Sequence, residues 1–310
     1  MAKQRIIALE EHYLDPELAA RSRYGLSARL SDVSAVRLSE MDEAGIDLQI
    51  LSHAPPGLQA FSDRGAAVVA RGVNDRLHAI VAENPRRFAA FASLPTADGD
   101  EAADELERCI ADLGFKGAMV HGLTAGIFLD DRRFRPLLAR AARLSVPLYI
   151  HPAEPLKVVQ EAYFSPYIKS HPTFVRAAWG FTFETGTQAI RLILSGAFDE
   201  YPSLQIILGH MGETIPFLMT RIDEALSRDT PMKDFRGYFS NHFSVTTSGF
   251  FSDAALLCCM QELGADRIMF SVDWPFASNR AAVEWFAKTN VSVADRAKIL
   301  HDNAEKMMRL

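Results

Sequence analysis

The stretch IIALEEH (residues 6–12) is an apolar run that ends abruptly in two carboxylates and an imidazole. Its aliphatic and β-branched start predicts a buried strand. Because side chains alternate between the two faces of a strand, Glu10 and His12 point the same way and Glu11 points the opposite way. Taken alone, the stretch fits either a solvated, charged strand end or half of a metal site.

Seven further short apolar runs follow, each typical of a buried strand. They span residues 47–52, 88–94, 116–121, 146–151, 204–208, 242–247 and 267–271. Stretches with helical spacing alternate with them at 38–44, 63–83, 98–112, 132–144, 187–197, 209–226 and 253–263, and helices at 280–288 and 293–308 close the chain. Strands this apolar must be covered on both faces, as in parallel sheets.

The alternation of strands and helices, without a linker, predicts an α/β fold: a single (β/α)8 TIM barrel forming one domain over residues 1–310. An aromatic-rich insertion, residues 152–186, follows the fifth strand. A doubly wound open sheet is the alternative. It is disfavoured because neither G-x-G-x-x-G nor the phosphate-binding G-x-x-x-x-G-K follows a strand.

The composition excludes several function classes. The chain is 48% hydrophobic and 23% charged, as is usual for a globular protein. A net charge of −6, with scattered lysines and arginines, argues against a nucleic-acid or anionic-membrane surface. No leader peptide or membrane-length apolar run is recognisable, and three cysteines are too few for a disulfide framework. We therefore expect a cytoplasmic protein acting on a small molecule.

Ionisable side chains gather at the ends of the predicted strands. In a (β/α)8 barrel these ends meet at the C-terminal face, where barrel enzymes place their chemistry. The side chains concerned are Glu10, His12, His53, His121, His151, His210 and Asp273. The best four-ligand set is Glu10, His12, His151 and Asp273, whose oxygens and imidazoles suit Zn²⁺, Mn²⁺ or Fe²⁺.

His210 and Glu213 are three residues apart at the start of a predicted helix, so they share a face. One interpretation of Glu213 is a favourable carboxylate in a helix first turn. The other is that Glu213 orients His210 and sets its tautomer and basicity. Beside a metal set, we expect the second.

Four motifs carry a family resemblance: ALEEH (8–12), YIHP (149–152), LGHMGE (208–213) and FSVDWPF (270–276). In this order they resemble the motifs of the amidohydrolase-superfamily decarboxylases (amidohydrolase 2, related to aminocarboxymuconate semialdehyde decarboxylase). The likeness is strongest to the γ-resorcylate (2,6-dihydroxybenzoate) decarboxylases, and it runs from the first strand to the last helix.

The resemblance implies that Glu10, His12, His151 and Asp273 hold one divalent metal, Zn²⁺ or Mn²⁺. It implies catalytic roles for Asp273 and His210, with Glu213 as the partner of His210. Trp179 and Phe183 would line the substrate pocket, unless these rings are simply core, and Arg221 would contact the active site or a neighbouring subunit. The full substrate-binding set expected is Trp179, Phe183, Arg221, His53, His121 and Phe276.

The sequence departs from the family pattern at two positions expected to face the substrate. His53 precedes Ala54-Pro55 where the resorcylate enzymes have an asparagine in a Leu-Asn-Ala-Pro run. His121 stands where those enzymes have the asparagine of Val-Asn-Gly. The metal set is therefore expected to be intact, while the identity of the substrate stays open.

The function implied is metal-dependent, non-oxidative decarboxylation of a hydroxylated aromatic carboxylic acid. The acid's carboxylate and ortho-hydroxyl oxygens would be chelated, and Asp273 or His210 would protonate the ring carbon before CO₂ leaves. A metal-dependent hydrolase or hydratase is the alternative, which the extra His53 and His121 fit slightly better. A silent binding barrel is disfavoured because all four candidate ligands are present. A homodimer or homotetramer is expected.

Overall fold

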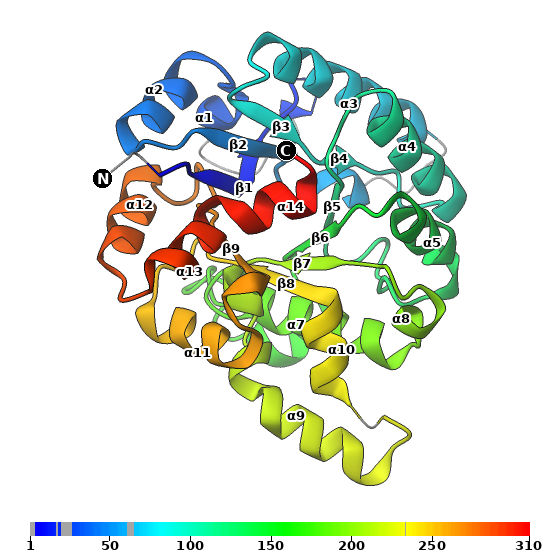
Figure 1. The fold of residues 1–310 in the computed structure, drawn as a ribbon. Helices are drawn as coiled ribbons and strands as arrows, with labels where there is room; N and C mark the ends of the chain where they lie inside the picture. The colour runs from blue at the N-terminus through cyan, green and yellow to red at the C-terminus, as the bar shows by residue number, and fades with distance from the viewer. Residues whose placement is uncertain (1–3, 17, 20–26, 61–64, 233) are drawn as a thin grey trace.

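The structure is a computed structural model that describes residues 4–16, 18–19, 27–60, 65–232 and 234–310. Within this part of the chain, short parallel strands form a ring that helices surround (Figure 1). The strands are β1 (Ile7–Tyr13), β2 (Leu48–His53), β3 (Phe88–Ala90), β4 (Ala92–Ser93), β5 (Ala118–His121), β6 (Leu148–His151), β7 (Ile206–Leu208), β8 (Phe243–Thr246) and β9 (Ile268–Met269).

Helices connect the strands and cover their outer face. They are α1 (Ser27–Ser31), α2 (Ala35–Ala44), α3 (Ala66–Glu83), α4 (Gly99–Ala111), α5 (Arg135–Leu144), α6 (Lys157–Val159), α7 (Gly180–Leu194), α8 (Ala197–Glu200), α9 (Ile215–Asp229), α10 (Phe235–His242), α11 (Asp253–Leu263), α12 (Asn279–Lys288), α13 (Val293–Ala297) and α14 (Asn303–Met308). Short helical turns are η2 (Gly57–Ala60), η3 (Arg132–Phe134), η4 (Gln160–Phe164), η5 (His210–Gly212), η6 (Ala265–Arg267) and η7 (Lys298–Asp302).

The strands pair in parallel and in chain order, β1-β2-β3 in one sheet and β4 to β9 in the other. Hydrogen bonds cross both seams: Phe91 N donates to the Leu51 carbonyl at 2.9 Å, and His12 N to the Trp274 carbonyl at 2.8 Å. Strand order in a doubly wound sheet reverses at a switch point, which does not happen here. The (β/α)8 barrel is confirmed, although the third predicted strand, 88–94, breaks at Phe91 into β3 and β4.

One apolar cluster fills the inside of the ring: Ile7, Leu9, Leu48, Ile50, Ala89, Phe91, Met119, Tyr149, Ile207, Met269, Ala304 and Met308. Ala304 and Met308 belong to α14, which lies across the centre of the ring (Figure 1). Helix α14 therefore closes the end of the barrel where the strands begin. The opposite end, where the strands finish, is the face on which the predicted site residues stand.

Strand β1 contains a register shift between Ala8 and Glu11 relative to β2. Leu9 packs inside the ring, whereas Ala8 packs in the outer core. Simple alternation would then turn Glu10 outward. A β-bulge, however, adds one residue to β1 between Ala8 and Glu11, so the side chains after it change face. Glu10 and His12 consequently point inward and Glu11 outward.

Three predicted helices differ in the structure. The helix expected at 187–197 begins earlier, at Gly180, inside the aromatic-rich insertion. The helix expected at 209–226 begins only at Ile215, and the closing helix is interrupted by the wider turn η7. The first two residues of the helix expected at 63–83 lie outside the described residues. No helix of the described part of the chain is long and apolar enough to cross a membrane.

Candidate metal centre

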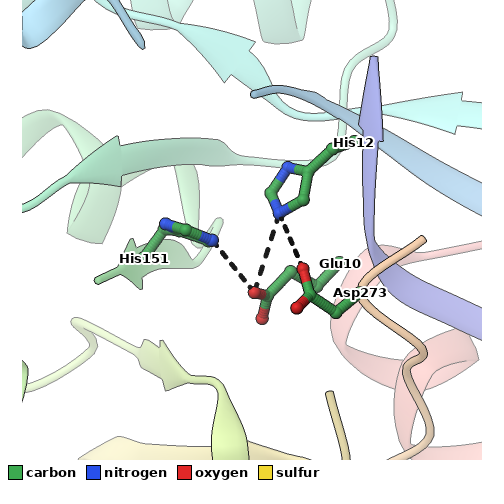
Figure 2. Close-up of side chains that lie close together, drawn as sticks. All are labelled: Glu10, His12, His151 and Asp273. Carbon is green, nitrogen blue, oxygen red and sulfur yellow. Dashed lines mark ion pairs between the residues drawn. The ribbon is translucent and has the colours of Figure 1, made fainter. Parts of the chain in front are cut away.

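The four predicted ligands converge at the carboxyl end of the barrel (Figure 2). Glu10 and His12 come from β1, His151 from the end of β6, and Asp273 from the segment after β9. Each offers one ligand atom, and these atoms all lie within 4.8 Å of one another. His151 Nε2 is 3.2 Å from Glu10 Oε1, and His12 Nε2 is 3.2 Å from Asp273 Oδ1.

The donor set fits a divalent cation. Among the described residues, Glu10 Oε1, His12 Nε2 and Asp273 Oδ1 are buried atoms without a hydrogen-bond partner. Buried polar atoms are normally paired, so unpaired ones that face each other fit the binding of a cation between them. Two imidazole nitrogens and two carboxylate oxygens are ligands that Zn²⁺ and Mn²⁺ accept.

Charge interactions within the centre shift the pKa values of its members in the metal-free chain. Burial lowers the pKa of His12, but the carboxylates of Asp273 and Glu10 outweigh burial and raise it to about 9. Burial raises the pKa of Glu10, but the imidazoles of His210, His12 and His151 bring it well below its ordinary value. The centre thus favours bound positive charge. In the metal-free chain, protons on its histidines supply that charge.

Neighbouring groups orient both histidine rings. His151 Nδ1 donates to the Pro152 carbonyl at 2.7 Å, so the proton sits on Nδ1 and Nε2 presents its lone pair to the centre. His12 Nδ1 lies 3.2 Å from Ser52 Oγ. Such partners fix the tautomer and orientation of histidines that bind metals.

Tyr149 is a site residue that the sequence reasoning missed. Its hydroxyl donates to Glu10 Oε2 and contacts Thr246 Oγ1 at 2.9 Å, which fixes the carboxylate. Its position was predictable from the sequence, because Tyr149 lies two residues before His151 and therefore on the same face of the strand. Gly209 passes so close that a Cβ there would lie 2.6 Å from Glu10 Oε2.

His210 and Glu213 are in direct contact beside the centre. His210 Nδ1 lies 2.8 Å from Glu213 Oε1, and His210 Nε2 lies 3.8 Å from Glu10 Oε1 and 4.0 Å from Asp273 Oδ2. Glu213 Oε2 also accepts a hydrogen bond from Thr182 Oγ1 at 2.7 Å. The predicted pairing is therefore present, with Thr182 as an additional partner.

The alternative interpretation of Glu213, a carboxylate in a helix first turn, is wrong. His210, Met211 and Glu213 have φ values of 50°, 58° and 53°, so this segment is a left-handed turn and α9 begins two residues later. Burial lowers the pKa of His210, but the carboxylates of Glu213, Glu10 and Asp273 outweigh it and hold the pKa well above its ordinary value. The protonated form of His210 is therefore favoured in the metal-free chain.

The first strand does not have a solvated end. Glu10, Glu11 and His12 are all 0% exposed, so that interpretation is wrong. Glu11 points away from the ligand atoms, as predicted, into a buried polar cluster on the outer face of the strand.

The two unexpected histidines have different environments. His121 lies beside His151, with ring centroids 4.9 Å apart, and its buried Nε2 has no hydrogen-bond partner in the described structure. His53 donates from Nδ1 to the Ala54 carbonyl at 2.8 Å and accepts at Nε2 from Asp15 N at 3.3 Å. Burial lowers the pKa of His53 to about 4. Both nitrogens of His53 are thus used by the protein, which favours a structural role over the predicted substrate contact.

The predicted aromatic residues are not core. Trp179, Phe183 and Phe276 are 48%, 39% and 37% exposed, and the Phe276 ring centroid lies 5.7 Å from that of His12. Arg221 is exposed on α9, which projects from the ring of helices (Figure 1). Within one chain the structure does not bring Arg221 into the site, and its contact with a neighbouring subunit stays a prediction.

The barrel, with imidazole and carboxylate side chains converging at its carboxyl end, agrees with the family resemblance of the four motifs. Residues 31–310 match the family model described as amidohydrolase, and the chain belongs to this family. The membership predicted from the four motifs is therefore confirmed.

Within the family, the chain is similar to aromatic-acid decarboxylases over its full length. It is 41% identical to γ-resorcylate decarboxylase of Rhizobium sp. (strain MTP-10005), with 98% of both chains covered. A solved structure of 2,6-dihydroxybenzoate decarboxylase in complex with 2,6-dihydroxybenzoate has a TM-score of 0.91 at 42% identity, covering 99% of each chain. A dihydroxybenzoic acid decarboxylase from Polaromonas sp. JS666, with bound manganese and the inhibitor 2-nitroresorcinol, has a TM-score of 0.91 at 39% identity, covering 99% of this chain and 97% of that chain.

Proposed function

We propose that the protein is a metal-dependent, non-oxidative decarboxylase of a hydroxylated aromatic carboxylic acid, a carboxy-lyase of the hydroxybenzoate type. One observation carries the proposal: unpaired, buried ligand atoms of Glu10, His12 and Asp273 converge with His151 in a chain that is 41% identical to a γ-resorcylate decarboxylase. These four residues hold one divalent metal. The single domain over residues 1–310, the cytoplasmic location and the homo-oligomer belong to the same proposal.

Mn²⁺ is the first ion to test, and Zn²⁺ is the second. A Polaromonas relative contains bound manganese, and a set with two carboxylates suits Mn²⁺ as well as Zn²⁺. When bound, the cation supplies Lewis-acid polarisation of the substrate's oxygens.

The chain's own residues supply the proton. His210 donates to Glu213 through Nδ1, so its second proton is on Nε2, the nitrogen that faces Glu10 and Asp273. The ring carbon that bears the carboxylate takes a proton from His210 or Asp273. The bond to the carboxylate then breaks, its electron pair stays on the ring, CO₂ leaves, and solvent reprotonates the donor.

The surroundings of the centre suit a planar acid with hydroxyl groups. Phe276 offers an apolar ring next to His12. Trp179 and Phe183 are exposed aromatic rings, and their place in the substrate pocket belongs to the same proposal. His121 Nδ1 donates to Gln59 Oε1 at 3.3 Å, which leaves Nε2 as an acceptor for a substrate hydroxyl.

A substrate panel tests the proposal. Protein loaded with Mn²⁺ is incubated with ortho-hydroxybenzoates, including 2,6-dihydroxybenzoate, and in parallel with lactones and aryl esters. We expect CO₂ release from at least one ortho-hydroxybenzoate and none from benzoate, which lacks the ortho-hydroxyl. Hydrolysis of a lactone or ester without any CO₂ release would overturn the proposal in favour of the hydrolase. The hydrolase has less support from the structure than from the sequence, because both ring nitrogens of His53 bond to the protein itself.

A further inference from the structure

Behind the candidate centre, on the outer face of β1, lies a buried cluster of polar side chains: Glu11 of β1, Arg37 of α2, Gln49 of β2 and Asn279 of α12. Gln49 connects them. Its Nε2 donates to Glu11 Oε2 at 3.2 Å and to Asn279 Oδ1 at 3.3 Å, and its Oε1 accepts from Arg37 Nη1 at 3.1 Å. Glu11 and Arg37 are each 0% exposed, so their polar atoms depend on partners within the protein.

Glu11 holds the backbone on both sides of Asp273. Its Oε1 accepts from the Val272 amide at 2.9 Å, and its Oε2 accepts from the Trp274 amide at 3.3 Å. Asp273 itself has a φ of 74°, a left-handed conformation that persists in non-glycine residues only where the surroundings impose it. Strand β9 ends at Met269, four residues earlier, so regular sheet pairing with β8 does not reach Asp273.

Arg37 connects the segment around Asp273 to strand β1, which carries His12. Its Nη2 donates to the carbonyl of His12, and its guanidinium carbon lies 3.9 Å from the centroid of the Trp274 ring. The indole is fixed in turn, because Trp274 Nε1 donates to Glu40 Oε2 at 2.6 Å. Arg37 therefore holds the backbone of His12 against Trp274, the residue that follows Asp273.

We propose that Glu11 and Arg37 are positioning residues that fix the separation of His12 and Asp273 and thereby set the affinity of the centre for its divalent metal. The inference rests on the proposed metal centre and adds two residues that touch neither metal nor substrate. Groups behind metal ligands typically change metal affinity about 10–100-fold when they are removed.

Mn²⁺ binding to the full chain, measured without substrate by electron paramagnetic resonance of the free ion, tests the inference. In Glu11→Gln one acceptor oxygen becomes an NH₂ group that faces a backbone N–H or the Gln49 amide, so at least one contact is lost. Arg37→Lys keeps the charge but loses the planar contacts to Trp274 and His12. Glu105→Gln is the matched control, since Glu105 is 3% exposed and bonds Asn74 and Arg108 on α3 and α4, away from the centre.

We expect Glu11→Gln and Arg37→Lys to weaken Mn²⁺ binding about 10–100-fold, and Glu105→Gln to change it less than about twofold. Wild-type affinity in both test variants, or an equal loss in all three variants, would overturn the inference. If Glu11→Gln does not fold, the Mn²⁺ affinity of Arg37→Lys is compared with that of Glu105→Gln, and this comparison decides. Failure of the wild-type chain to bind Mn²⁺ would instead overturn the proposed metal centre, and the two failures are distinguishable.

Discussion

At the scale of single residues, Asp273 is held in place by contacts with β1 and with Gly249. Its amide donates to the Glu10 carbonyl at 3.0 Å, and Gly249 leaves room for its carboxylate, since a Cβ there would lie 3.0 Å from Asp273 Oδ2. It is both a candidate ligand and a candidate proton donor. We therefore expect the proposed function to depend strongly on its carboxyl group.

We expect Asp273→Asn to reduce CO₂ release at least about 100-fold at saturating Mn²⁺, because an amide neither donates an acidic proton nor carries the ligand charge. The measurement is the initial rate of CO₂ release from an ortho-hydroxybenzoate, with circular dichroism to establish that the variant is folded. A variant with the wild-type rate would exclude a chemical role for Asp273.

Glu213→Gln should lower the pKa of His210, because one of the carboxylates that raise it is removed. Since the donor form of His210 is the protonated one, the alkaline limit of CO₂ release should move to lower pH. Thr182→Val provides a milder comparison, as it removes only the hydroxyl contact to Glu213. Histidine NMR titrations of the metal-free variants report the pKa directly, and an unchanged value in Glu213→Gln would contradict this role.

At the scale of elements, the sequence predicts the faces of β1 but not the means by which they arise. Alternation correctly separates Glu11 from Glu10 and His12, because it is local. The bulge that brings Leu9 and Glu10 to the same side depends on the register with β2. The left-handed turn at His210 was not predicted, because the motif LGHMGE resembles a helix start and its spacing does not indicate positive φ values.

Helix α7 contains a buried carboxyl group that makes stability depend on pH. Burial raises the pKa of Glu184 from its usual 4.5 to about 7, and its side chain is 3% exposed. The folded state thus binds a proton more tightly than the unfolded state. The stabilisation is complete below about pH 4.5 and is lost as pH rises to about 7, by up to about 3 kcal/mol.

Glu184→Gln removes this group without changing its size. We expect the free energy of unfolding of the variant, relative to wild type, to increase between about pH 4.5 and pH 7. Urea denaturation of both metal-free proteins across this range measures the difference. A constant difference between the two proteins would show that Glu184 titrates normally.

Gly57 of turn η2 packs directly against His121 and leaves no room for a side chain of its own. Gly57 has a φ of +60°, and a Cβ there would lie 2.4 Å from His121 Nδ1. Gly57→Ala should therefore displace His121 and raise KM as well as destabilise the fold by about 1–3 kcal/mol. Gly114→Ala is the matched control, because Gly114 has a φ of +71° with nothing within 4 Å of the added Cβ. Equal KM values in the two variants would argue against a role of His121 in binding.

At the scale of the whole molecule, the convergence of the four candidate ligands is predictable because barrel topology brings strand ends together. The residues that hold them were harder to find. Arg37 and Thr182 lie on α2 and α7, and nothing in their local sequence indicates that they reach the site. Such contacts depend on how helices pack around the barrel, which periodicity does not specify.

On the proposed function, one metal ion at this centre is required for decarboxylation. The most direct measurement strips the protein with a chelator, then adds Mn²⁺ stepwise while the rate of CO₂ release from an ortho-hydroxybenzoate is recorded. We predict that release stops on chelation, returns in proportion to the metal added and levels off near one equivalent per chain. Release at the full rate from metal-free protein would contradict the claim.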